Sequence, residues 1–259
     1  MRKKLTPSAE TRMISTGRAP GAKPHEDFCR IMSAILQNYQ RIQQRIVSAA
    51  TRVGRNPSDI TLLAVTKGRP VEDIRALLAG GVRDFGENRV PETVEKVEAI
   101  GAADAPRWHF IGHLQTNKVK KLVGRMALLH SVDSLHLAEA LQRACELRDC
   151  TQEILLEVNV SGEESKYGLS PNAVEAVAVG LKPFDRLRAV GLMTMAPYTL
   201  ELEETRPVFR GLRELRDRLR EAGYVDLQHL SMGMSHDFEI AVEEGATLAR
   251  VGSALFENV

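Results

Sequence analysis

The sequence predicts an α/β fold, and specifically a single-domain (β/α)8 barrel of the TIM type. Apolar runs of strand length alternate with helical patterns, eight such runs occur, and the whole alternating region spans about 230 of the 259 residues. Parallel strands joined by helices require right-handed crossovers, and eight is the number of strands that closes a barrel. An open doubly wound sheet is the alternative, because it is built from the same units.

The first 27 residues differ from the rest of the chain. They are rich in Arg, Lys, Ser, Thr, Pro and Gly and have no apolar periodicity. We therefore predict a disordered tail over residues 1–27 and assign residues 28–259 to the barrel. An organelle transit peptide is the alternative, because acidic residues are few in this segment.

The strands and helices follow in order from a long first helix, which we expect over residues 28–53. The predicted strands are residues 60–66, 82–86, 108–111, 128–132, 153–158, 187–193, 227–230 and 247–251. The first of them is apolar enough to be covered on both faces, as strands of a parallel sheet are. The predicted helices include residues 71–79, 90–100, 135–147 and 203–222. Ser134 and Ser235 each precede a helical pattern and are expected to cap it.

Composition excludes several classes of function. With 35 basic and 34 acidic residues, the net charge of +1 gives no reason to expect a nucleic-acid partner. Three cysteines without a CxxC pair are typical of reduced thiols in a cytoplasmic protein. No run approaches the roughly 20 apolar residues of a membrane helix. His109 and His113 lie on a strand and its exit, so we predict no zinc site there.

A lysine directly after the first predicted strand is the strongest single indication of chemistry. Lys67 lies between Thr66 and Gly68, at the carboxyl end of the strand, where α/β folds build their sites. Partial desolvation of an ammonium group favours the neutral amine, which is a nucleophile toward aldehydes. The alternative is a lysine that simply extends into solvent past the strand end.

Two segments after the last two predicted strands indicate phosphate binding. The first runs from Ser231 to Ser235 around a glycine, and the second from Arg250 to Ser253. The loops after strands seven and eight are the customary phosphate site of such barrels, although ordinary caps and turns would give the same residues. A nucleophilic lysine beside a phosphate site indicates either a phosphorylated sugar or pyridoxal 5′-phosphate (PLP), and spacing does not separate the two.

Six motifs in order resemble a known family. They are residues 64–67 (AVTK), 85–88 (FGEN), 108–118 (WHFIGHLQTNK), 191–195 (GLMTM), 231–237 (SMGMSHD) and 250–256 (RVGSALF). Together they resemble the YggS/PROSC family, the pyridoxal phosphate homeostasis proteins, over about residues 28–256. The family's fold is similar to the barrel domain of alanine racemase, so the resemblance also implies a barrel like that of PLP enzymes of fold type III.

The resemblance implies a PLP site with no catalytic residue and no metal. It implies that Lys67 forms the Schiff base, and that Lys166 is a second lysine that helps to release or transfer the cofactor. The positions that match the family's other contacts are Ser235, Gly252 and Ser253 for the phosphate, Arg250 for the pyridine nitrogen, and Asn88 and Met193 for the ring.

Three positions depart from the family's pattern. Arg69 stands where a second lysine is frequent, and arginine keeps the charge but cannot serve as an alternative amine. Ser253 replaces a more frequent threonine and keeps the hydroxyl. Glu257 replaces a usual glycine. None of the three affects Lys67.

The same residues bear on whether the protein is an enzyme. An arginine at the pyridine nitrogen stays charged, which leaves the ring a poorer electron sink. A racemase also needs a second acid–base group, which alanine racemases take from an additional β-domain, although Tyr167 and Tyr198 lie in rim loops that could approach. We therefore expect a monomer or weak dimer that holds PLP and delivers it to apo-enzymes. A weakly active PLP-dependent amino-acid racemase and a Schiff-base aldolase without PLP are the alternatives.

Overall fold

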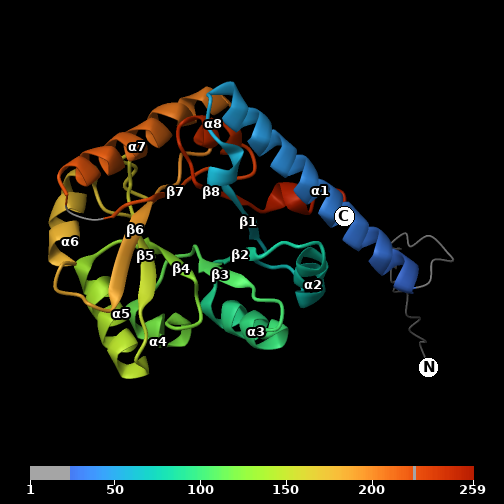
Figure 1. Cartoon of the computed structure of the whole chain (residues 1–259), viewed down its shortest axis with the longest axis horizontal. Coiled ribbons are helices and arrows are strands. Elements are labelled where there is room, and N and C mark those ends of the chain that lie inside the picture. The colour runs from blue at the N-terminus through green and yellow to red at the C-terminus, as the bar shows by residue number, and fades with distance from the viewer. Residues whose placement is uncertain (1–23, 224–225) are drawn as a thin grey trace, which may run out of the picture.

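The computed structural model describes residues 24–223 and 226–259, so most of the predicted tail, residues 1–23, lies outside the described residues. Within the described chain, eight parallel strands close into a barrel in sequence order, from β1 to β8 and back to β1. This closure confirms the predicted (β/α)8 barrel and excludes the open doubly wound sheet. Figure 1 shows the helices arranged around the outside of the strands.

The strands and helices lie close to the predicted positions. The strands are β1 Thr61–Val65, β2 Asp84–Glu87, β3 Arg107–Phe110, β4 Leu128–Val132, β5 Gln152–Glu157, β6 Leu187–Met193, β7 His229–Ser231 and β8 Leu248–Val251. The helices are α1 Pro24–Arg52, α2 Val71–Ala79, α3 Val90–Ile100, α4 Val119–Leu122, α5 Leu135–Arg148, α6 Val174–Gly180, α7 Arg206–Glu221 and α8 Phe238–Glu243. The bounds of β4, β6, α2 and α3 are those predicted, and the α5 cap is confirmed, because Ser134 Oγ accepts from Leu137 N.

Helix α1 closes the outside of the barrel beside the junction of β1 and β8. It packs against α8 and α2, as Figure 1 shows, and its buried face carries Ile35, Ile42 and Ile46. The buried amide of Asn38 donates to the backbone oxygens of Leu255 and Glu257, which fastens the C-terminal segment to the helix. The helix therefore covers the outside of the barrel between α8 and α2.

The barrel has two separate apolar clusters. The larger one includes most of the buried side chains, from strands and helices alike. The smaller one consists of Leu128, Leu155, Val190, Met193 and Leu248. Because strand residues alternate between faces, Leu248 and Arg250 of β8 share a face, and the smaller cluster fills the interior beneath Arg250. Apolar packing in the barrel interior thus supports Arg250 and the carboxyl ends of the strands, where the site lies.

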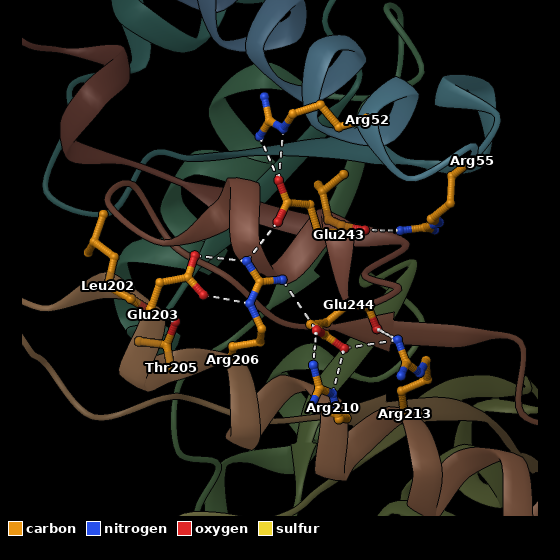
Figure 2. A network of polar contacts seen from close by, with 11 residues as sticks. Arg52, Arg55, Leu202, Glu203, Thr205, Arg206, Arg210, Arg213, Glu243 and Glu244 are labelled. Atoms are coloured by element: carbon orange, nitrogen blue, oxygen red, sulfur yellow. Dashed lines mark hydrogen bonds and ion pairs between the residues drawn. The ribbon is translucent and has the colours of Figure 1, made fainter.

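A network of ion pairs fastens α7 to α8 and α1 (Figure 2). At its centre the Glu244 carboxylate, whose side chain is only 6% exposed, accepts hydrogen bonds from three arginines of α7. The neighbouring Glu243 carboxylate joins α7 to α1 in the same way. The arginines involved are Arg52, Arg206, Arg210 and Arg213.

Among the helices of the described residues, none combines the length and the apolar character that a membrane span requires.

Candidate functional site

A cavity of about 460 Å³ opens at the carboxyl ends of the strands. Side chains and backbone from the segments that follow β1, β2, β3, β5, β6, β7 and β8 contribute to its wall. Parallel strands direct all their carboxyl ends to one rim, and this is why residues far apart in the sequence meet there. The residues predicted for the site that line the cavity are Lys67, Asn88, Ser235, Arg250, Gly252 and Ser253.

Lys67 is carried on a tight turn at the end of β1. The turn is closed by a hydrogen bond from Arg69 N to Thr66 O of 3.0 Å. Gly68 has a φ of +70°, which a side chain would disfavour, and it therefore lets the chain reverse directly after the lysine. Lys67 is exposed and its side chain forms part of the cavity wall.

Arg250 lies on the interior face of β8, the strand that pairs with β1. Only 4% of the residue is exposed, and its guanidinium donates to Ser231 Oγ at 2.6 Å and to Thr194 O at 2.9 Å. Burial lowers the pKa of Arg250 to about 10, an effect that the carboxylates of Asp237 and Glu157 partly oppose. The side chain therefore remains a cation at neutral pH and supplies the cavity with a fixed positive charge.

A chain of hydrogen bonds continues from Arg250 through the barrel interior. Ser231 Oγ lies 2.8 Å from His130 Nδ1, His130 Nε2 lies 3.0 Å from His109 Nδ1, and His109 Nε2 lies 3.1 Å from Asp84 Oδ1. Burial holds the pKa of His130 well below its usual value, so this ring is neutral. The tautomers of the two rings set which atom donates in each of these bonds, and the Ser231 hydroxyl, which accepts from Arg250, has both a proton and a second lone pair available for His130. The chain connects the Ser231 partner of Arg250 to Asp84 through the barrel interior.

The loops after β7 and β8 meet at one serine. Ser235 Oγ accepts from Gly252 N at 3.1 Å and from Ala254 N at 3.4 Å. The expected cap is wrong: α8 begins at Phe238 with Asp237 in the N-cap position, because the chain makes an extra turn after β7. Two backbone N–H groups that converge on one oxygen are a donor set suited to phosphate.

Glycine is required in the first of these loops. Gly233 has a φ of +86°, and a Cβ built there would lie 2.5 Å from the Cβ of Ala241. No L-residue fits both the backbone conformation and the available space. The close approach to α8 brings the loop that carries Ser235 against the end of β8.

Two polar atoms in residues that line the cavity are buried without a hydrogen-bond partner among the described residues. They are Asn88 Oδ1 and His236 Nε2. Asn88 is covered by the loop after β3, where a Cβ on Gly112 would lie 2.2 Å from Asn88 O. Unpaired buried polar atoms are rare in proteins, and their presence in two residues of one cavity wall makes the cavity a candidate site for a polar ligand.

Two residues predicted for the site lie elsewhere. Met193, the last residue of β6, is 1% exposed and packs in the interior cluster, whereas Met195 lines the cavity. Lys166 lies beside the cavity rather than in its lining: its Nζ donates to Met195 O at 3.4 Å and forms an ion pair with Glu163. Arg69 likewise turns away, with its guanidinium 4.4 Å from the centre of the Phe256 ring.

Comparison with known proteins assigns the family. The family described as alanine racemase, N-terminal domain, matches residues 32–258. A pyridoxal phosphate homeostasis protein of Aquifex aeolicus is 45% identical over 220 residues, which cover 85% of this chain and 96% of that protein. One of Pseudomonas aeruginosa is 41% identical over 226 residues, covering 87% and 96%. The chain belongs to the pyridoxal phosphate homeostasis protein family.

A solved structure of the same kind agrees with this assignment. PipY of Synechococcus elongatus PCC7942, solved with PLP bound, is 35% identical to this chain with a TM-score of 0.73. The match covers 83% of this chain and 99% of PipY. The resemblance stated from the six motifs is thereby confirmed at the level of family and fold.

Several residues at the mouth of the cavity were not predicted as site residues. The His113 ring stacks on Tyr167 with ring centres 4.0 Å apart, and Tyr198 contacts His236 edge-on at 5.1 Å. Of these, His113, Tyr167 and His236 line the cavity. Their positions just after strands were visible in the sequence, but their orientation depends on contacts between separate loops.

Proposed function

We propose that this member of the family binds PLP, holds it on Lys67 and takes part in intracellular PLP homeostasis by keeping and delivering the cofactor. The observation that carries the proposal is that Lys67, Arg250 and the donor set at Ser235 line one cavity. When bound, PLP supplies an aldehyde to which an amine attaches reversibly and a phosphate that anchors it.

The residues present fit this cofactor. The backbone N–H groups of Gly252 and Ala254, with the hydroxyls of Ser235 and Ser253, would hold the phosphate. Arg250 would face the ring nitrogen, since its bonds to Ser231 and Thr194 leave further N–H donors on the cavity side. The unpaired amide oxygen of Asn88 indicates a polar contact with the ligand. In place of Met193, we assign the ring contact to Met195, which lines the cavity.

Holding and delivery, rather than turnover, agree with the charge at Arg250. A guanidinium donates protons in hydrogen bonds without losing them, so it leaves the ring nitrogen unprotonated and disfavours carbanion chemistry. We infer that the partners are PLP and the apo-forms of PLP enzymes. We assign residues 28–259 to one domain, active in the cytoplasm, where such enzymes are made.

A weakly active amino-acid racemase is the second candidate, and Tyr167 is the observation that favours it. Tyr167 lines the cavity and is 56% exposed, so its hydroxyl is accessible to an amino acid. A racemase needs such a second acid–base group. Exchange of the α-proton of amino acids in deuterated water, lost in Tyr167→Phe, would support this candidate, and no exchange across a broad panel would reject it.

The proposal is tested by the absorption spectrum of the protein with added PLP, before and after borohydride reduction, followed by peptide mapping. We expect an absorption band near the edge of the visible range that disappears on reduction, and a pyridoxyl adduct on Lys67. Lys67→Ala should lose both. Lys121→Ala, the same change at an exposed lysine of α4, should keep both. An adduct at another lysine would reject the role of Lys67, and the absence of both band and adduct would reject PLP binding and favour the aldolase alternative.

A further inference from the structure

A lysine is buried directly beneath the turn that carries Lys67. Lys96, on α3, is 4% exposed. Its Nζ donates to Thr66 O at 2.7 Å, to Glu87 Oε1 at 2.8 Å and to Glu92 Oε1 at 2.5 Å. The three N–H donors of the ammonium thus have three acceptors. A buried charge is costly unless it is paired in this way, so the buried position of Lys96 depends on these acceptors.

The two peptide groups that flank Lys67 are both held by this helix. Lys96 binds the carbonyl oxygen of Thr66, which precedes Lys67. Glu92 Oε1 accepts from the backbone N–H of Gly68, which follows it, at 2.6 Å. Lys96 and Glu92 are four residues apart and are paired with each other, so α3 holds the turn as one unit.

These two contacts define the conformation of the turn. The bond from Arg69 N to Thr66 O and the positive φ of Gly68 are those of a type II turn, in which Lys67 occupies the first corner. A type I turn differs by a flip of the central peptide, and that flip would turn the Gly68 N–H away from Glu92. The Cα–Cβ bond of Lys67 leaves the chain between the two held peptide planes, so its direction is fixed when both are.

We propose that Glu92 and Lys96 are positioning residues that direct the Lys67 side chain into the cavity by locking its turn. This inference rests on the proposed function, because it gives Lys67 the role of attachment site. Among the described residues, Lys96 and Glu92 make their hydrogen bonds and ion pairs to the turn, to Glu87 and to each other, so the inference gives a use to a cluster outside the phosphate loops. It also predicts that these residues affect how fast Lys67 reacts more than how tightly the cavity binds.

The test compares two measurements on Glu92→Ala. The first is the rate at which added PLP attaches to Lys67, followed by absorbance. The second is the affinity for pyridoxine 5′-phosphate, which has the same ring and phosphate but no aldehyde. We expect attachment to slow on the order of tenfold, from loss of a charge-assisted hydrogen bond, with the affinity for the analogue unchanged. Glu92→Gln, which keeps an oxygen acceptor for Gly68 N–H, should restore most of the rate.

The controls separate positioning from folding. Glu95→Ala, at an exposed residue of the same helix, should behave as the unmodified protein. Lys96→Met should slow attachment as Glu92→Ala does, with thermal unfolding measured for every variant. In NMR spectra, the Gly68 amide proton should lie downfield because of its carboxylate partner, and should move upfield in Glu92→Ala.

The outcomes are distinct. A folded Glu92→Ala protein that attaches PLP at the unmodified rate, or equal losses in rate and analogue affinity, would overturn the positioning role while leaving the proposed function intact. A Gly68 amide shift that does not respond would overturn it independently of PLP. If the unmodified protein forms no adduct on Lys67, the proposed function fails first and the inference fails with it.

Discussion

Glu244→Gln tests how far the ion-pair network between α7 and α8 stabilises the barrel. The substitution keeps the shape of the side chain but removes the charge that Arg206, Arg210 and Arg213 share (Figure 2). Hydrogen bonds to a charged group contribute roughly 1.5–3 kcal/mol each when buried. The three arginines are between 24% and 50% exposed, so solvent screening reduces their contributions well below that sum.

We therefore expect Glu244→Gln to lower the free energy of unfolding by about 2–3 kcal/mol. For a chain of this size the thermal midpoint should fall by roughly 4–10 °C. Differential scanning calorimetry measures it, with Glu221→Gln, at an exposed residue that ends α7, as the matched control. A midpoint within about one degree of the unmodified protein would show that the network contributes nothing measurable.

The pH dependence of the same variant checks the physical reason. Burial alone would raise the pKa of Glu244, but hydrogen bonds from Arg210 and Arg206 hold it below its usual value. A carboxyl group whose pKa is lower in the folded state stabilises the fold above its unfolded pKa of about 4.3, and this stabilisation is lost as the pH falls. The difference between Glu244→Gln and the unmodified protein should be full at pH 7 and should shrink below pH 4.

Three further variants test the site. Gly233→Ala should destabilise the protein and weaken PLP binding, because the positive φ and the 2.5 Å approach to Ala241 exclude a side chain; unchanged calorimetry would contradict this. Arg250→Gln should bind PLP on the order of tenfold more weakly while the adduct stays on Lys67, as an absorbance titration would show, and an unchanged affinity would count against the proposed ring contact. Lys166→Ala should slow transfer of PLP to an apo-enzyme in a coupled activity assay, with the unmodified rate as the result that removes Lys166 from the transfer role.

The fold could be predicted from the sequence because its signals are local. Apolar runs, their number and the alternation with helices are enough to specify a closed barrel, and chain order then places Lys67, Asn88 and Arg250 on one rim. The family motifs added the expected roles of these residues. Even β7, the shortest strand, begins only two residues and ends one residue after its predicted bounds.

The rest depends on contacts between distant segments, which periodicity does not report. Ser235 looks like a helix cap in the sequence, yet its hydroxyl accepts from the loop after β8. Met193 and Met195 differ by two positions, and the end of β6 decides which of them reaches the cavity. Lys96 is an ordinary charged residue of the amphipathic helix α3 in the sequence, and only the folded position of that helix makes it a buried partner of Thr66, the residue after β1.

The interior hydrogen-bond chain bears on whether such a site can do more than hold a cofactor. Arg250 donates to Ser231, and His130 and His109 connect Ser231 to the carboxylate of Asp84. Burial holds the pKa of His130 well below its usual value, so this ring is neutral at pH 7 and has no imidazolium proton to supply to the cavity. The Arg250 guanidinium is held in place by Ser231 and stays charged. It therefore favours tight, reversible retention of the cofactor over proton transfer at the cofactor ring. This reasoning from the barrel interior supports the proposed carrier role independently of the phosphate loops.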